Sequence, residues 1–393
     1  MIVFTLHSQL MNALSQATAS IDSPEAFAPV TRKTILRNFT SPIIKVSKKK
    51  KVQTSNKASL PQWMKNYFDW HKKQMSQLSP SNWEQQKFLV LSCLGNQPKC
   101  GGLADRLKPL PLLLYFANQT GRIFMIRWDK PYALEEFLQP NELNWSMPQW
   151  MVNETEKDYG KPLIRGGNQL RRQLPTNQRR VVYGNIQDFH GGGLLYDELI
   201  TEAYNATTSS TDKYQLIYHD LFRYIFKPSP PVQKLVEERM KDGKLTPGEY
   251  SIAHYRAFYA IEHKKEQMSN KTLELDAVNI AKCGSVLRPG GPVYFASDSV
   301  VALNAVQRYA KEHNKHIVVT FDGPDPPHID LDLDRNISEY YSIFVDLYMM
   351  GNGRCVAFGK GGFGRYALMM GYNSSCEFRY LHRKSKRKCE WME

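Results

Sequence analysis

Residues 250–256 read YSIAHYR, and this stretch predicts a short buried strand that ends at Arg256. It opens an alternation of strand and helix patterns that continues to residue 370. Short apolar runs are typical of buried parallel strands, and longer periodic segments are typical of helices. The further strands expected are residues 292–298 (PVYFASD), 316–321 and 355–359, and the helices expected are residues 300–313, 338–350 and 364–370.

The first half of the chain shows the same pattern around residues 88–94, which read FLVLSCL. A glycine turn follows this expected strand. An apolar helix is then expected over residues 103–115, although Pro109 and Pro111 should kink it or end it early. Residues 122–128 form the next expected strand. Strand, turn, helix and strand make a βαβ unit with a right-handed crossover.

Alternation in both halves predicts the α/β class, with two Rossmann-like domains that face a central cleft. The expected parts are a polar stem at residues 1–85, domains at residues 86–247 and 248–380, and a basic tail at residues 381–393. Between the clearer elements we expect a short amphipathic helix at residues 61–77, a strand at residues 179–185, and helix over residues 211–241 broken by Pro228, Pro230 and Pro231.

The chain of 393 residues is 42% hydrophobic and carries a net charge of +14, so it is globular and basic. This charge favours an anionic partner such as a nucleotide, a nucleic acid, an acidic glycan or a membrane surface. Alternatively, part of the charge belongs to solvated tails, because residues 45–51 and 379–388 hold much of it.

Six cysteines leave the cellular compartment open. Cys93 and Cys100 are close enough in sequence to bridge locally, and Cys355, Cys376 and Cys389 lie in one region. The chain has no C-x-x-C pair and no tight Cys/His cluster, so a structural zinc site is not expected.

Eight N-x-[ST] acceptor sequences are compatible with the secretory pathway, at Asn38, Asn118, Asn144, Asn153, Asn205, Asn270, Asn336 and Asn373. No stretch reaches the roughly 18 apolar residues that a membrane span needs. Ala17-Thr18-Ala19 resembles a signal-peptide cleavage site, but the region before it is poorly apolar.

His254 and Arg256 lie where the strand at 250–255 ends, and ligands of open α/β sheets bind beyond the carboxyl ends of the strands. The arginine side chain offers a planar fork of donors that matches phosphate oxygens two at a time. A fixed arginine also stabilises charge that develops on a departing diphosphate. The simpler alternative is an ordinary strand-end arginine in a salt bridge.

Two glycine-rich turns are candidates for phosphate binding. Gly101 and Gly102 allow close approach of the backbone, and Asp105 and Arg106 lie in the first turn of the helix that follows. The later turn, residues 359–365, reads GKGGFGR and lacks the ending of an ATP-binding P-loop. Either turn is alternatively a plain connection between a strand and a helix.

Acidic residues suggest two further sites. Asp298 ends the strand at 292–298 and suits a base or ribose, or alternatively the N-cap of the next helix. The carboxylates of Asp322, Asp325, Asp330, Asp332 and Asp334, with His328, could suit a divalent metal. They do not fit the EF-hand spacing, and a polar loop is the favoured interpretation.

Together these motifs resemble the GDP-fucose-dependent fucosyltransferases, which include α1,2-, α1,6- and protein O-fucosyltransferases. HYR at residues 254–256 resembles their H-x-R element, and GGLADRL at 101–107 is similar to their upstream glycine loop. FASD and the segment DLYMMGNGRCVAFGKGGFGRYA at 346–367 resemble their last motif. The similarity covers roughly residues 88–372.

The resemblance implies a GT-B-like fold, GDP-fucose as the donor, inversion at the anomeric carbon and no obligatory metal or other cofactor. It implies that Arg256 holds the β-phosphate, that His254 supports the loop or the nucleotide, and that Asp298 lies near the guanosine. It also implies that Gly362, Phe363 and Gly364 line the diphosphate. The other expected donor-binding residues are Gly101, Gly102, Arg106 and Arg365. The second domain would bind the nucleotide sugar, and the first would face the acceptor.

The expected function is inverting fucosyl transfer to a hydroxyl of a glycan or a protein, in the Golgi or endoplasmic reticulum lumen. Membrane attachment is expected only through an N-terminal anchor outside this sequence. Inverting transfer requires a general base, and the candidates are Asp105 and the acidic residues between Asp129 and Glu136. The alternative is a non-catalytic nucleotide- or carbohydrate-binding protein of the same fold. Nucleic acid is not an expected partner, because no binding motif accompanies the charge.

Overall fold

A computed structural model describes residues 60–95, 100–155, 167–184, 210–258, 269–319, 324–373 and 376–380. Residues 54–393 belong to one compact unit. Most of the predicted stem and the predicted basic tail at 381–393 lie outside the described residues, and the domain boundaries stay a prediction. None of the described helices is both long and apolar enough to cross a membrane.

The second half of the chain builds a five-stranded sheet whose neighbouring strands are all parallel. Its strands are β6 (Ser251–Tyr255), β7 (Val293–Ser297), β8 (Ile317–Val319), β9 (Cys355–Phe358) and β10 (Glu377–Arg379). The helices are α11 (Asn270–Leu287), α12 (Val300–Glu312), α13 (Ile337–Gly351) and α14 (Gly362–Met370). Alternate residues of β6 pack on opposite faces, since Ile252 and Ala253 belong to different hydrophobic clusters.

The strand order of this sheet is β10-β9-β6-β7-β8. Counted along the chain from β6, this is the Rossmann order 3-2-1-4-5, in which the direction of winding reverses between the first and fourth strands. The reversal point is therefore the gap between the carboxyl ends of β6 and β9, where ligands of such sheets bind.

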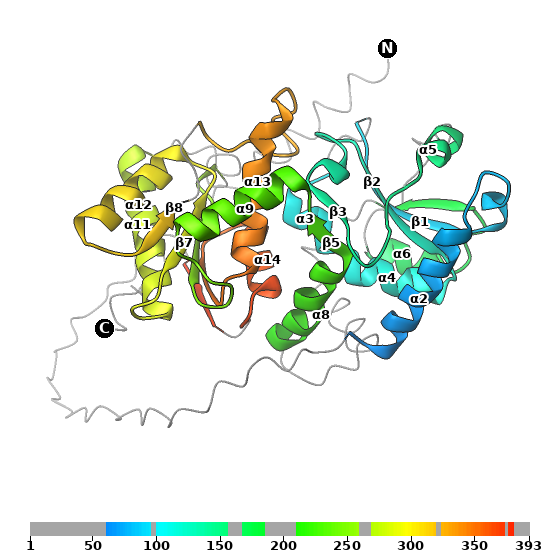
Figure 1. Ribbon diagram of the computed structural model, residues 1–393, viewed down its shortest axis with the longest axis horizontal. Coiled ribbons are helices and arrows are strands. Elements are labelled where there is room, and N and C mark those ends of the chain that lie inside the picture. The colour runs from blue at the N-terminus through cyan, green and yellow to red at the C-terminus, as the bar shows by residue number, and fades with distance from the viewer. Residues whose placement is uncertain are drawn as a thin grey trace, which may run out of the picture. The chain divides into compact units, whose positions relative to one another are not determined.

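The first half builds a smaller parallel sheet of order β2-β1-β4, on the right in Figure 1. Its strands are β1 (Phe88–Cys93), β2 (Ile123–Trp128) and β4 (Val181–Gly184). The expected helix at 103–115 is two helices, α3 (Leu103–Leu107) and α4 (Leu110–Gln119), and the break at Pro109 confirms the effect of the prolines. The remaining elements are α2 (Gln62–Gln77), η1 (Trp83–Gln85), η2 (Leu134–Glu136), α5 (Gln149–Thr155) and α6 (Gly167–Gln173).

A helical segment connects the two sheets. It contains α8 (Ser210–Ile225), β5 (Phe226–Pro228) and α9 (Pro230–Asp242), so the helix breaks at the prolines as predicted. β5 pairs antiparallel with β3 (Leu138–Pro140), a pairing that the sequence did not predict.

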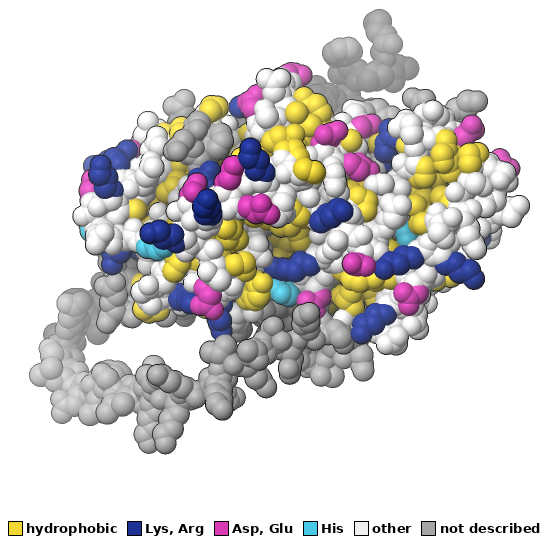
Figure 2. Space-filling view, viewed as in Figure 1, with side chains coloured by type: hydrophobic (Ala, Val, Ile, Leu, Met, Phe, Trp, Pro, Cys, Tyr) yellow, Lys and Arg dark blue, Asp and Glu magenta, His cyan; other side chains and the backbone are white. Residues whose placement is uncertain are grey.

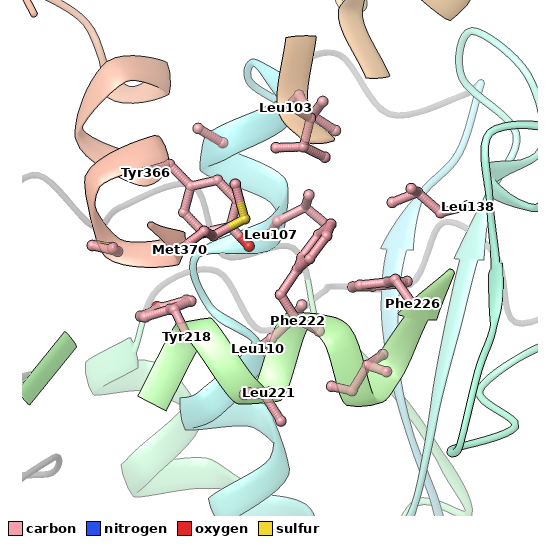
Figure 3. Packing of buried hydrophobic residues seen from close by; sticks show 14 of the residues in the cluster. Leu103, Leu107, Leu110, Leu138, Tyr218, Leu221, Phe222, Phe226, Tyr366 and Met370 are labelled. Carbon is pink, nitrogen blue, oxygen red and sulfur yellow. The ribbon is translucent and has the colours of Figure 1, made fainter. Parts of the chain in front are cut away.

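The core that joins the two halves contains side chains of α3, α8 and α14, which pack together in Figure 3. Leu107 of α3, Tyr218 of α8 and Tyr366 of α14 are buried in one cluster. The rings of Tyr218 and Tyr366 meet edge to face at 5.6 Å, and Tyr218 donates a hydrogen bond to the Lys108 carbonyl. This packing fixes α3 and α14 against each other, so the glycine turns that precede them face the same space.

Arg223 of α8 holds the far ends of two helices of the second half. Its guanidinium donates to the carbonyls of Gly351 at 2.9 Å and Met370 at 3.2 Å. These carbonyls lie in the last turns of α13 and α14, where the helix leaves them without partners. The connecting segment thereby sets the position of α14, whose other end approaches the candidate site.

Disulfides join Cys93 to Cys100 and Cys355 to Cys376, so the two cysteines expected to be close enough for a local bridge form one. No cysteine in the described part of the chain is free. On the face shown in Figure 2, lysine and arginine side chains are interspersed with acidic ones. This face of the described residues therefore offers no continuous basic groove of the kind that binds nucleic acid.

Candidate active site

A cavity of about 330 Å³ lies at the carboxyl ends of β6, β7 and β9 and is closed on the other side by the turn that follows β1. This volume is within the range of small-molecule sites. Of the residues predicted from the sequence, the cavity is lined by Gly102, Asp105, His254, Arg256, Asp298, Gly362 and Phe363.

His254, at the end of β6, is a buried wall of this cavity with 4% of its surface exposed. Burial, assisted by the positive charge of Arg256, lowers the pKa of its imidazole to about 3, so the ring is neutral. Its Nδ1 has no hydrogen-bond partner among the described residues, and its ring meets the Phe363 ring edge to face at 5.6 Å. A neutral imidazole can donate one hydrogen bond and accept another, so His254 can contact a ligand in the cavity without adding charge.

Arg256 is held by Asp298, the acidic residue that directly follows β7. Its Nε lies 3.7 Å from Oδ2 of Asp298. Asp298 also accepts backbone hydrogen bonds from Ala257 at 2.6 Å and Phe258 at 3.3 Å. The alternative that Asp298 caps α12 is not adopted, because the N-cap residue of that helix is Ser299. Asp298 thus orients the arginine towards the cavity.

We expect the effect of Asp298→Asn on the melting temperature to become more favourable as the pH rises from 4.5 to 7, in addition to a pH-independent loss of one backbone hydrogen bond. Burial raises the pKa of Asp298 to about 6, although Arg256 and the two backbone donors oppose the shift. The folded-state pKa exceeds the unfolded value near 4, so the folded protein retains the proton longer. The stability that protonated Asp298 contributes is therefore lost as the pH rises from about 4 to about 6.

The measurement is the pH dependence of the melting temperature of both proteins. Asparagine resembles the protonated acid in shape and charge, so the difference should change by the equivalent of about 2 kcal/mol between pH 4.5 and pH 7. A difference that stays constant between pH 4.5 and pH 7 would contradict this assignment.

The turn after β9 brings backbone close to both arginine and lysine. Gly361 has a φ of 97°, which favours glycine. A Cβ on Gly362 would lie 2.6 Å from the Lys108 ammonium. α14 begins at this turn, and the N–H groups of its first turn have no partners within the helix. Backbone amides and two cations, Arg256 and Lys108, therefore converge on one helix N-terminus, an arrangement that binds anions.

We expect Gly364→Ala to destabilise the fold by about 1–3 kcal/mol through overpacking and to weaken GDP binding. The new Cβ would lie 2.6 Å from Cβ of Phe358 and 2.9 Å from Nδ1 of His254, so the first turn of α14 must shift. Thermal melting and calorimetric titration of GDP check this prediction. Gly95→Ala is a control for the loss of a glycine, because a Cβ there would meet its nearest atom at 3.9 Å, an ordinary contact.

The turn after β1 forms the opposite wall. Gly101 has a φ of 79°, and Asp105 in the first turn of α3 lines the cavity. One carboxylate oxygen of Asp105 lies 3.4 Å from the Lys108 ammonium. Lys108 is a candidate that the sequence analysis missed, since it lies in the break between α3 and α4 and faces α14 only in the fold.

The structure does not bring every predicted residue to the cavity. Arg106 is buried at 3% exposure and donates to the carbonyls of Lys130 and Ile329 behind the wall. Gly101, Gly364 and Arg365 also lie outside the lining, as do the alternative bases between Asp129 and Glu136. The binding roles of these residues stay predictions.

The segment at residues 324–336 forms the rest of the wall through side chains that include His328 and Leu331. Two of the predicted acidic residues of this segment accept backbone hydrogen bonds. Asp325 accepts from the backbone of Val300, and Asp332 from that of His328. No group of three or more His, Cys, Asp or Glu side chains that could hold a metal ion occurs among the described residues. Asp322 lies outside them.

Among the comparisons with known proteins, only the comparison with solved structures finds similar proteins. No family model matches the chain, and no curated protein matches it. A mutant of FUT1 from Arabidopsis thaliana, solved in complex with GDP, aligns with a TM-score of 0.55 and 11% sequence identity, over 84% of this chain and 80% of that chain. The fucosyltransferase NodZ from Bradyrhizobium aligns at 15% identity over 72% of this chain and 92% of that chain, with a TM-score of 0.38, which is too low to carry an argument.

The FUT1 alignment extends over most of both chains, and at this identity it establishes the fold alone. Together with the two parallel sheets and the Rossmann strand order, it confirms the predicted class: the chain has an α/β, GT-B-like fold with Rossmann-like sheets.

Proposed function

We propose that this protein is a glycosyltransferase that moves fucose from GDP-fucose to a hydroxyl group of a glycan or a protein, with inversion at the sugar carbon. The proposal rests on one observation: Arg256 and the N-terminus of α14 line the same cavity. This cavity lies at the carboxyl ends of β6 and β9, where the strand order reverses. A fold shared with a FUT1 structure in complex with GDP supports the choice of nucleotide.

We place the diphosphate at the first turn of α14, against Gly362 and Phe363. Arg256 would contact the β-phosphate with two parallel hydrogen bonds, and Lys108 would add a positive charge from the opposite half. Burial lowers the pKa of Lys108, and the nearby Asp105 carboxylate favours its charged form. The guanosine would extend towards Asp298 and Phe258, which line the same cavity.

In the proposed reaction the acceptor oxygen attacks the anomeric carbon while the bond to the β-phosphate oxygen breaks. Negative charge then grows on the diphosphate, and Arg256 together with the α14 amides stabilises it. His254 is neutral, so it adds a hydrogen bond rather than a charge. Asp105 takes the acceptor proton, because its carboxylate lines the cavity beside the first turn of α14. Asp298, in contrast, accepts backbone hydrogen bonds and pairs with Arg256.

We also propose a compartment and an acceptor side. The disulfides at Cys93–Cys100 and Cys355–Cys376 are typical of proteins that fold in an oxidising compartment, which supports the lumen of the secretory pathway. The acceptor would enter past the turn after β1 and the segment at 324–336, the two walls that the nucleotide does not occupy.

A thermal-shift screen tests the choice of nucleotide. A ligand that binds only the folded state stabilises it by about 2.7 kcal/mol at 100 times its dissociation constant. We expect GDP and GDP-fucose to raise the melting temperature more than UDP, ADP or their sugars. Equal shifts with all three nucleotides, or none with GDP, would contradict the proposal.

A further inference from the structure

Asp330 lies buried between the two halves of the molecule, with 8% of its surface exposed. Its carboxylate accepts backbone hydrogen bonds from Cys100 at 3.0 Å and Gly101 at 3.3 Å. It also forms ion pairs with Arg106 at 3.3 Å and Lys130 at 3.4 Å. An acid of the second half therefore holds the glycine turn of the first half. We call Asp330, Arg106 and Lys130 the Asp330 cluster.

Arg106 reinforces this connection. Its guanidinium donates to the Ile329 carbonyl at 3.0 Å, and its Nε donates to the Gly101 carbonyl at 2.9 Å. One side chain thus ties the glycine turn directly to the neighbour of Asp330. Removing one member of a buried charge cluster leaves its partners without compensation, so the cluster acts as a unit.

The same two segments form walls of the cavity. A Cβ on Gly102 would lie 3.7 Å from Nε2 of His328, so the turn and the segment at 324–336 meet at the site. At its beginning, this segment is fixed to the nucleotide half, because Asp325 accepts from the first N–H of α12 at 2.6 Å. The glycine turn that precedes Asp105 is therefore held by Asp330, in addition to the packing of α3 against α14.

We propose that Asp330 is a positioning residue for transfer: through Arg106 and the turn at Gly101–Gly102, it holds Asp105 at its working distance from the donor. This inference rests on the proposed function. It also assigns Arg106 a role in the wall instead of a contact with the diphosphate. None of the hydrogen bonds and ion pairs given above for the Asp330 cluster involves Arg256 or α14, the proposed donor-binding elements.

The test is Asp330→Asn, alone and combined with Lys130→Met. The single variant leaves two buried cations facing a neutral amide, whereas the double variant removes one cation and restores the charge balance. Asparagine has one acceptor oxygen in place of two, so the N–H of either Cys100 or Gly101 loses its partner. Asp334→Asn is the matched control, because Asp334 is exposed in the same segment.

We expect kcat for GDP release from GDP-fucose to fall by about 100-fold, since a small misplacement of a reacting group has effects of this size. The dissociation constant for GDP should change less than about 3-fold, because Arg256 and α14 are untouched. The double variant should regain thermal stability but not kcat. Wild-type kcat in the double variant, or a loss of GDP affinity as large as the loss of kcat, would overturn the proposal.

Hydrogen exchange provides a readout that does not depend on turnover. In Asp330→Asn at least one of the amides of Cys100 and Gly101 should lose protection, while those of α14 should keep it. Unchanged protection at both amides would overturn the claim that Asp330 holds the turn. A wild-type protein that binds no GDP would instead contradict the proposed function, and hydrogen exchange would still decide the claim about Asp330.

Discussion

Arg256→Ala should lower the rate of fucose transfer by about 10³-fold, since loss of one fixed donor to developing charge has an effect of this order. The guanidinium lines the cavity and is oriented by Asp298 at 3.7 Å, so it is already in place when charge grows on the diphosphate. Binding of GDP should also weaken, because the β-phosphate keeps its charge in the product.

The assay is GDP release from GDP-fucose, with water and with a mixture of glycoproteins and free oligosaccharides as acceptors. Arg256→Lys should recover only part of the rate, because an ammonium keeps the charge but lacks the planar fork. Arg308→Ala is the control, since Arg308 is 57% exposed and pairs with Glu274. Turnover by Arg256→Ala equal to that of the control would remove Arg256 from the mechanism.

Asp105→Asn should lower kcat by about 10²–10⁴-fold, the usual contribution of a general base. The amide cannot take the proton of the acceptor hydroxyl. Binding of GDP should not weaken, because the Asp105 carboxylate lies beside the first turn of α14, 3.2 Å from a Cβ on Gly362, and its loss removes a negative charge near the diphosphate. This combination of a lost rate and retained affinity distinguishes a base from a donor-binding residue.

Asp129→Asn provides the comparison for Asp105. Asp129 is exposed and does not line the cavity, so its variant should keep wild-type kcat. If Asp129→Asn lost activity and Asp105→Asn kept it, the assignment of the base would be wrong.

Much of the fold could be predicted from local sequence because both sheets are buried. Strands such as β1 and β9 are short apolar runs, and the structure places their ends within about one residue of the prediction, as is usual for strong patterns. The break at Pro109 followed from proline chemistry alone. α11 was missed, because its buried face contains small residues such as Ala277, Ala281 and Gly284, which give a weak apolar pattern. β10 was also missed, because it is only three residues long.

The residues of the candidate site also differ in whether local sequence could predict them. Arg256 and Asp298 follow strands directly, so the rule that ligands bind beyond strand ends locates them from sequence. The role of Lys108 depends on α14, and the role of Arg106 depends on Asp330, which is 224 residues away. Neither contact leaves a local signal. Helix geometry offers one clue, because adjacent residues on a helix point about 100° apart, so Asp105 and Arg106 point in different directions.

The most direct test of the central claim is a crystal structure of the protein with GDP. We expect the diphosphate at the N-terminus of α14, with the β-phosphate in contact with Arg256 and the backbone amides of Gly362 and Phe363. A diphosphate bound at Gly101–Gly102 before α3, or GDP bound outside the cavity, would contradict the account.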